Sequence, residues 1–341
     1  MFPIAGLVEA ELRRQDKLID DDTANPTEKG AESGEFAPLK AVAQRHHSHL
    51  VNLIAADAGA KAEDIMDLEL VLYDTQKACL GGLRDEFIFS ARLDNLNSTY
   101  CATMGLIDSV SNPTALDKET SIRLIACFDH EEIGSMTAQG AFSMMMPAII
   151  RRLSVLPIIA PSSNGSSDSE DSYDKTTIDA ADPTSSTAYE QTLARSFLLS
   201  ADMAHSINPN YATKYESDHK PALNKGPVIK INANARYATN SPGIVLLQEI
   251  ARRAVKIAHD DGPDGVPLQL FVVRNDSSCG STIGPMLSAH LGARTLDLGN
   301  PQLSMHSIRE TAGTEDVHHA IRLFSSFFQL YSSLEGTILV D

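Results

Sequence analysis

Residues 122–132 read Ile-Arg-Leu-Ile-Ala-Cys-Phe-Asp-His-Glu-Glu, a mostly apolar run that ends in acidic residues. A run of this kind, interrupted only by Arg123, predicts a buried strand that delivers carboxylates to the end of a sheet. Two adjacent glutamates in that place can divide the work of a metal hydrolase, because one can bind the metal while the other handles the proton of a metal-bound water. Taken alone, Glu131-Glu132 is weak evidence, since such pairs are common on solvated helices.

The rest of the chain alternates between patterns typical of strands and of helices. Strands are predicted at residues 66–73, 86–90, 228–233, 268–273 and 294–298. Helices are predicted at residues 4–19, 39–58, 98–109, 136–153, 243–259 and 282–291, and a last helix begins at Thr314. Its apolar stripe should face a core and consists of Val317, Ile321, Leu323, Phe324, Phe327 and Phe328. This alternation predicts the α/β class, with a layered, largely parallel sheet and helices on both faces.

Residues 161–187 interrupt the alternation. They are rich in Ser, Asp and Thr and nearly free of large apolar side chains. Such a segment cannot bury enough surface to offset its conformational entropy. We expect a disordered surface insertion within one domain, because the layered pattern resumes after it.

Composition narrows the class of protein. The chain has 341 residues, with 28 basic and 45 acidic side chains and a formal charge of −17, and no long Lys/Arg stripe offsets that charge. A nucleic-acid partner is therefore not expected. The four cysteines form no CxxC pair, which argues against a cysteine zinc site and for reduced thiols in an intracellular protein. No apolar stretch is long enough to span a membrane, so we expect a cytoplasmic protein with no membrane partner.

Acidic and imidazole side chains follow predicted strands or lie in tight loops at four places: Asp94, Glu131-Glu132, Asp202 and His306. Two zinc ions about 3.5–4 Å apart need a bridging carboxylate together with terminal carboxylate and histidine ligands. Side chains at the strand ends of one sheet can converge on such a pair however far apart they are in sequence. Each also has a simpler interpretation: Asp94 in a turn, Asp202 as a helix cap, His306 as a packed histidine.

Six sequence blocks carry a resemblance to a known family. They are Arg92-Leu93-Asp94-Asn95, residues 129–135 (Asp-His-Glu-Glu-Ile-Gly-Ser), residues 200–205 (Ser-Ala-Asp-Met-Ala-His), residues 225–230 (Lys-Gly-Pro-Val-Ile-Lys), residues 274–285 with the run Cys-Gly-Ser-Thr-Ile-Gly-Pro, and residues 296–310. In this order, and over nearly the whole chain except the insertion, they resemble the aspartyl aminopeptidase family of dizinc metallopeptidases.

The resemblance implies a role for each site residue. Asp94 would bridge two zinc ions, Glu132 and His306 would complete one metal site, and Asp202 would belong to the other. Glu131 would be the general base that takes a proton from a metal-bound water, whose pKa the metal brings toward about 7.

The resemblance also implies a substrate and an organisation. The family removes an N-terminal Asp or Glu, so peptides with an acidic N-terminus are the expected substrates and Lys230 the expected cationic contact for that side chain. Strand alternation places Lys230 on one face with Val228. Residues 1–86 would belong to a smaller dimerisation domain and residues 87–341 to the catalytic domain, in a homo-oligomer.

The chain departs from the family at its beginning. The family's catalytic domain opens with a His-Thr-Asp motif whose histidine binds the second metal, and no such motif occurs here, so we expect an N-terminally truncated form. The site of Asp94, Glu132 and His306 stays complete, whereas the second keeps only Asp94 and Asp202 and should bind weakly, because zinc prefers three protein ligands. A single strong zinc is one hypothesis. An alternative function is a truncated paralogue, catalytically impaired or inactive, that assembles with or regulates full-length subunits, and a third possibility is a longer natural product.

Overall fold

A computed structural model describes residues 42–155, 187–254 and 264–338. The chain divides into two compact units, Met1–Tyr73 and Asp74–Asp341. The first unit contains α2 (Val42–Arg45), α3 (Ser48–Asp57) and the 3-10 turn η1 (Ala62–Asp64). The helix predicted at 39–58 is therefore interrupted. His47 has extended backbone angles and its ring accepts the N–H of His49, so it caps a new helix.

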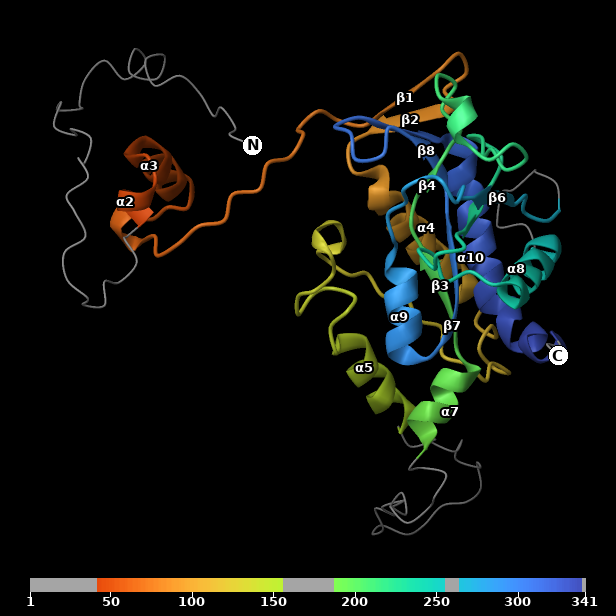
Figure 1. Cartoon of the computed structure of the whole chain (residues 1–341). Coiled ribbons are helices and arrows are strands. Elements are labelled where there is room, and N and C mark those ends of the chain that lie inside the picture. The colour runs from red at the N-terminus through yellow and green to blue at the C-terminus, as the bar shows by residue number, and fades with distance from the viewer. Residues whose placement is uncertain (1–41, 156–186, 255–263, 339–341) are drawn as a thin grey trace, which may run out of the picture. The chain divides into compact units, whose positions relative to one another are not determined.

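Two mixed sheets form the frame of the second unit (Figure 1). The four-stranded sheet has the order β3 (Phe197–Ala201), β7 (Arg294–Gly299), β5 (Val228–Ile231) and β6 (Gln269–Val272). The five-stranded sheet has the order β1 (Cys79–Gly81), β2 (Phe87–Ser90), β9 (Glu310–Gly313), β8 (Pro301–Leu303) and β4 (Ala204–His205).

The α/β class is confirmed, and the expectation of a largely parallel sheet fits the four-stranded sheet but not the five-stranded one. Strand pairs β3/β7, β5/β6 and β4/β8 are parallel, whereas β1/β2, β2/β9, β8/β9 and β5/β7 are antiparallel. The connections from β1 to β2 and from β8 to β9 are short, and a short connection can only join antiparallel neighbours. The β8–β9 connection carries His306, so this antiparallel hairpin positions one of the predicted site residues.

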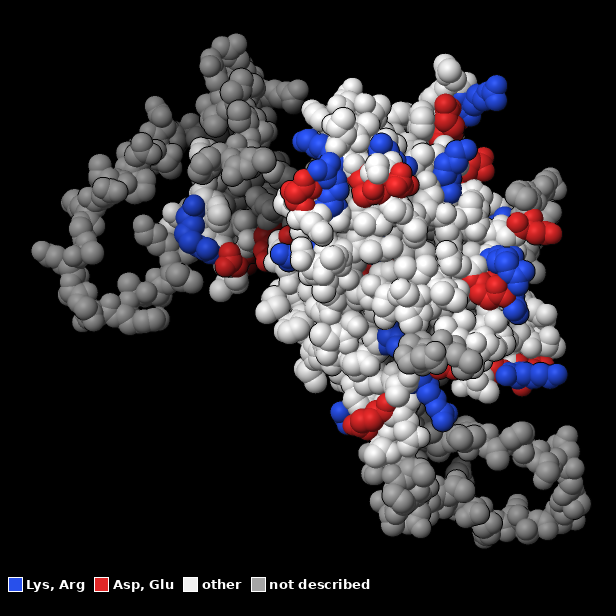
Figure 2. Space-filling view, turned by 45° about the vertical axis from the view of Figure 1, so that its right-hand side comes forward, with Lys and Arg blue, Asp and Glu red and all other residues white. Residues whose placement is uncertain are grey.

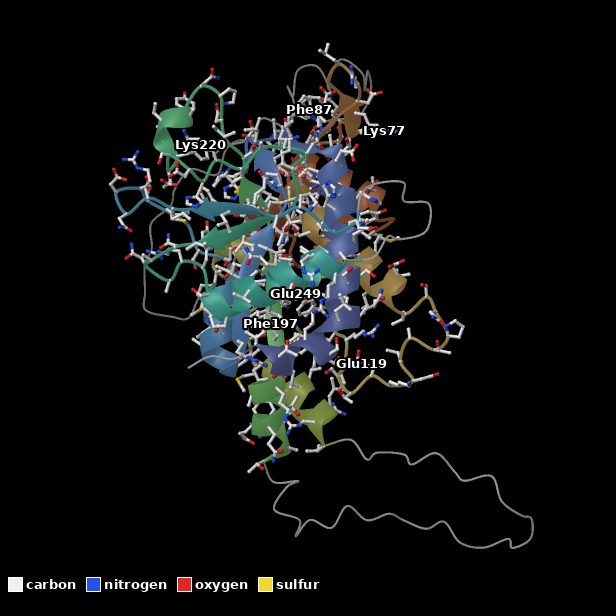
Figure 3. All side chains as sticks on the ribbon, turned by 90° about the vertical axis from the view of Figure 1, so that its right-hand side faces the viewer. Lys77, Phe87, Glu119, Phe197, Lys220 and Glu249 are labelled. Atoms are coloured by element: carbon white, nitrogen blue, oxygen red, sulfur yellow. The ribbon has the colours of Figure 1, made fainter. Side chains whose placement is uncertain are left out.

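Helices cover both faces of the four-stranded sheet, as predicted. Phe197 and Leu199 of β3 pack into a core with α8 (Ser241–Arg253) and α10 (Thr314–Leu334), whereas Leu198 packs with α9 (Ile283–Leu291). Alternate residues of a strand point to opposite faces, so these contacts place the helices in separate layers. Figure 3 shows Phe197 toward one end of this unit and Phe87 of β2 near the other.

Helix α10 is the central helix of the larger core. It begins at Thr314 as predicted, and its buried stripe includes Leu323, Phe324 and Phe327. Removing side chains of this size from water contributes about 1.5–3 kcal/mol each. Helix α4 (Leu93–Ser109) packs closely against it at Gly105, where a Cβ would lie 2.6 Å from that of Phe324. A glycine is therefore required at this contact.

The helix expected at 282–291 is α9, and four of the predicted strands are also found. Thr282, expected as its first residue, instead caps the helix by accepting the N–H of Gly284, and Gly292 ends it with a φ of 66°. The predictions at 86–90, 228–233, 268–273 and 294–298 correspond to β2, β5, β6 and β7. The helix expected at 243–259 is α8, which ends at Arg253 in the described part of the chain.

Two predicted strands are wrong. Residues 66–73 and 122–128 have no regular secondary structure and pair with no described strand. The side chain of Ile122 is 65% exposed and that of Leu124 is 39% exposed, so the segment before Glu131 is not a buried strand. Apolar sequence indicates a tendency to be buried, but a strand exists only where another strand supplies hydrogen-bond partners.

The helix expected at 136–153 is shorter than predicted, because residues 136–144 form turns and α5 spans Met145–Ser154. Pro147 explains the late start, since proline is tolerated only in the first turn of a helix. The helix at 4–19 and the insertion at 161–187, apart from Thr187, lie outside the described residues. No described helix is both long and apolar enough to cross a bilayer.

Candidate metal centre

Asp94 lies at the start of α4, just after the end of β2. Asp94 and Asn95 have non-helical backbone angles within the first turn, and the peptide bond between them is cis. The amide of Asn95 donates to the carbonyl of Ala201 at 2.8 Å. Because Ala201 ends β3, this bond holds the Asp94 loop beside the strand end that carries Asp202.

Glu131 and Glu132 lie in a 3-10 turn (η2, Glu131–Ile133) rather than at a strand end. His130 precedes it with a φ of 62°, and its Nδ1 lies 2.7 Å from the hydroxyl of Thr137. This turn, rather than a strand end, therefore sets the orientation of both glutamates. The strand predicted before them, at 122–128, pairs with no described strand.

Three predicted ligands converge. His306 Nε2 lies 3.2 Å from Asp94 Oδ2 and 3.2 Å from Glu132 Oε1, and one ligand atom of each residue lies within 4.8 Å of the others. Zinc binds carboxylate oxygen and imidazole nitrogen at about 2.0–2.2 Å in tetrahedral geometry, which separates neighbouring ligand atoms by roughly 3.3–3.5 Å. The observed spacing therefore fits a divalent cation held by these three side chains.

Asp202 and Lys230 form an ion pair beside this cluster. Asp202 follows β3, and its Oδ2 accepts from Lys230 Nζ at 3.1 Å. Lys230 is 2% exposed and its Nζ lies 5.4 Å from the ring centre of Tyr237. Tyr237 in turn accepts a hydrogen bond from the thiol of Cys279 at 3.3 Å. No pattern in the sequence singled out Tyr237, because a tyrosine in a loop has no characteristic spacing.

The carboxylates of the site repel one another. Burial raises the pKa of Asp94 to about 8, with further contributions from Asp202 and Glu132. Burial also raises the pKa of Glu131, and the charges of Asp202 and Glu132 act in the same direction, whereas Lys230 opposes them. A divalent cation would offset this repulsion, so the electrostatics agree with the geometry.

Two other histidines, His205 and His219, are not part of the ligand cluster. His205 follows Asp202 closely, but burial lowers its pKa and its ring contacts that of Phe271. His219 hydrogen-bonds to Glu216. Neither was predicted to be a ligand.

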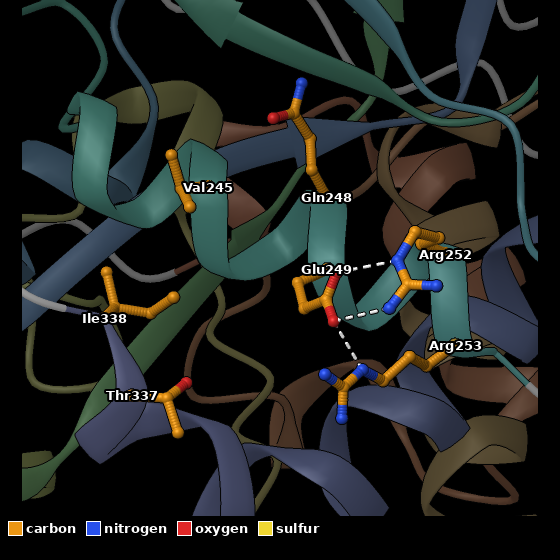
Figure 4. Close-up of a pocket in the computed structure, with 7 residues that line it drawn as sticks. All are labelled: Val245, Gln248, Glu249, Arg252, Arg253, Thr337 and Ile338. Carbon is orange, nitrogen blue, oxygen red and sulfur yellow. Dashed lines mark hydrogen bonds and ion pairs between the residues drawn. The ribbon is translucent and has the colours of Figure 1, made fainter.

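A surface hollow of about 400 Å³ lies elsewhere, between α8 and the 3-10 turn η4 (Glu335–Thr337). Figure 4 shows Glu249 bonded there to Arg252 and Arg253. No predicted site residue lines it. The face of the molecule in Figure 2 shows acidic and basic side chains interspersed, without a large basic patch.

Comparison with known proteins identifies the family. Residues 13–328 match the model of the aminopeptidase I zinc metalloproteases (M18). The chain is 65% identical over all 341 residues to an aspartyl aminopeptidase of Aspergillus oryzae and 50% identical to aspartyl aminopeptidase 4 of Saccharomyces cerevisiae. The chain therefore belongs to the M18 family of zinc metalloproteases.

Solved structures agree with this assignment. The chain resembles a subunit in the cryo-EM structure of a complex of Ape4 and Nbr1, with a TM-score of 0.72, 46% identity and coverage of 87% of this chain and 50% of that one. It also resembles the mApe1 dodecamer of Saccharomyces cerevisiae, with a TM-score of 0.65, 30% identity and coverage of 87% and 58%. The chain spans 64% of the Aspergillus relative and 61% of the yeast one.

Proposed function

We propose that this chain carries the catalytic centre of a metallo-aminopeptidase that releases N-terminal Asp or Glu from peptides. The observation that carries the proposal is the convergence of Asp94, Glu132 and His306, three side chains from distant segments, at the spacing that a divalent cation requires. The names of the aspartyl aminopeptidase relatives support the acidic substrate. Nothing in the comparisons favours the alternative of a non-catalytic subunit.

The residues present fit a zinc ion. When bound, zinc would act as a Lewis acid and lower the pKa of a water molecule to about 7. Asp94, Glu132 and His306 would hold it. Glu131 lies next to Glu132 in the same turn and serves as the general base that accepts the proton of the attacking water.

Lys230 supplies the local cation that an acidic N-terminal residue needs in a chain with a charge of −17. Its ammonium has three N–H donors, of which Asp202 takes one. The other two donors would bind a substrate carboxylate that reaches this buried ammonium. Lys230 is thus our candidate for the specificity residue.

We propose one strong and one weak zinc site. The strong site has three protein ligands, Asp94, Glu132 and His306, whereas among the described residues the second has Asp94 and Asp202. By analogy with the mApe1 dodecamer, we also propose a homo-oligomer. The assignment of residues 1–86 to a dimerisation domain and a cytoplasmic location remain predictions from the sequence.

The test is hydrolysis of an aspartyl-amide reporter by the chain in added zinc. We expect turnover that Glu131→Gln abolishes and that Glu190→Gln, an exposed glutamate on α7 (Ala188–Arg195), leaves unchanged. Lys230→Met should reduce hydrolysis of the aspartyl reporter more than that of an alanyl one. Zinc binding without any turnover would instead favour the non-catalytic alternative, and unchanged turnover in the Glu131 variant would exclude the assigned base.

A further inference from the structure

One buried carboxylate joins the two loops that carry Asp94 and His306. Glu310 is the first residue of β9 and is 2% exposed. Its Oε2 accepts the backbone N–H of Asp94 at 2.9 Å, and its Oε1 accepts the backbone N–H of His306 at 2.8 Å. Each oxygen of one side chain therefore holds the backbone of one candidate metal ligand.

We propose that Glu310 is a positioning residue that fixes the distance between Asp94 and His306 and thereby sets the affinity of the centre for a divalent cation. The inference rests on the proposed metal function. Glu310 is not one of the three clustered side chains, and both of its oxygens accept backbone N–H groups. It acts through the two backbone amides that it anchors.

The place of Glu310 in the sheet makes it a suitable anchor. It pairs with Ser90, the last residue of β2, so the strand that leads into the Asp94 loop and the strand that leaves the His306 loop are joined at this position. Beyond it both loops leave regular structure: Arg92 has a φ of 60° and His306 a φ of 65°. The backbone amides of Asp94 and His306 therefore have no partner in a neighbouring strand, and the Glu310 carboxylate accepts their hydrogen bonds instead.

The chemistry of the bonds explains why a carboxylate is needed. Both bonds are accepted, one by each oxygen, and a carboxylate has two acceptor oxygens and no donor. Glutamine has the same shape but presents one acceptor and one NH2 group, which would face an N–H donor. Outer partners that orient metal ligands typically change metal affinity by about 10–100-fold when removed.

The first experiment measures zinc affinity by competition with a chromophoric chelator. Glu310→Gln should weaken zinc binding by about 10–100-fold. The matched control is Glu315→Gln, which removes the same charge from an exposed position on α10. An affinity within about twofold of the wild type in folded Glu310→Gln would overturn the inference.

A second variant separates positioning from charge. Glu310→Asp keeps the negative charge but is one methylene shorter, so it cannot reach both amides. We expect it to bind zinc weakly as well. Wild-type affinity in this variant would show that charge alone matters, and would overturn the positioning role.

A third measurement needs no metal and so stands apart from the proposed function. In the metal-free wild type, hydrogen exchange of peptides covering Asp94 and His306 should be slow, and it should accelerate in either Glu310 variant but not in Glu315→Gln. A wild-type chain that binds no zinc would refute the proposed metal function. The exchange rates would still show whether Glu310 holds the backbone amides of Asp94 and His306. Fast exchange of both amides in the wild type would overturn the inference even where neither variant folds.

Discussion

Replacing His306 with alanine removes one of the three converging ligands. The side chain is 61% exposed, but His306 has a φ of 65° and its ring lies 3.2 Å from Asp94 and from Glu132, so alanine should change the stability of the metal-free chain by about 1 kcal/mol. The loss of the ligand is therefore read from the stability that each variant gains when zinc is added. This makes the variant a sharp test of the centre.

The expected magnitude follows from linkage. Zinc at 100 times its dissociation constant stabilises the folded state by about 2.7 kcal/mol. In a unit of this size, each kcal/mol of stability raises Tm by about 2–4 °C. Zinc should therefore raise the Tm of the wild type by roughly 5–10 °C. If losing a ligand weakens binding by at least 100-fold, the same zinc concentration stabilises the variant by about 0.4 kcal/mol, or roughly 1 °C.

Thermal scans with and without zinc measure this difference. His290→Ala serves as the control, because His290 lies in the last turn of α9 and contacts Phe142 rather than the site residues. The His290→Ala variant should show the same zinc-induced rise in Tm as the wild type. An equal zinc shift in His306→Ala and the wild type would refute the proposed centre.

Three further predictions concern the fold. Gly105→Ala should destabilise the chain by about 1–2 kcal/mol in urea unfolding, because the new Cβ would meet α10. The control is Gly336→Ala, whose Cβ would meet no atom within 4 Å and should change the stability little. Equal effects of the two variants would contradict the close helix contact. Burial raises the pKa of Asp316 to about 6, so the folded state binds this proton more tightly than the unfolded state does. Relative to Asp316→Asn, the stability should therefore fall by up to about 3 kcal/mol as the pH rises from about 4 to about 6. A stability difference between the two chains that does not change with pH would disprove this. Burial also raises the pKa of Cys101 to about 12, so iodoacetamide should label exposed Cys127 first, and equal native labelling, read by mass spectrometry, would argue against that burial.

The sequence predicted best where local chemistry decides the structure. Helix α9 was predicted to within one residue and ends before Gly292, because a glycine at a helix end adopts the left-handed backbone whatever surrounds it. The start of α10 at Thr314 was likewise predictable. The ligands Asp94, Glu132 and His306 were predicted from motifs, and the structure brings them together.

The remaining features depend on neighbours that are distant in sequence. The strand expected at 122–128 has no described partner, and periodicity alone cannot supply one. The role of Glu310 was also missed, although the residue was within a recognised block. Its function lies in accepting two backbone N–H groups, and that assignment requires coordinates.

The tether between Asp94 and Glu310 joins positions 216 residues apart. During synthesis on the ribosome, the nascent polypeptide cannot close this loop until Glu310 has emerged. The turn that carries Asp94 therefore lacks its anchor until late in synthesis. Closing so long a loop costs conformational entropy and slows folding. Zinc uptake would then report that the polypeptide through Glu310 has been made and that its two ends have folded together.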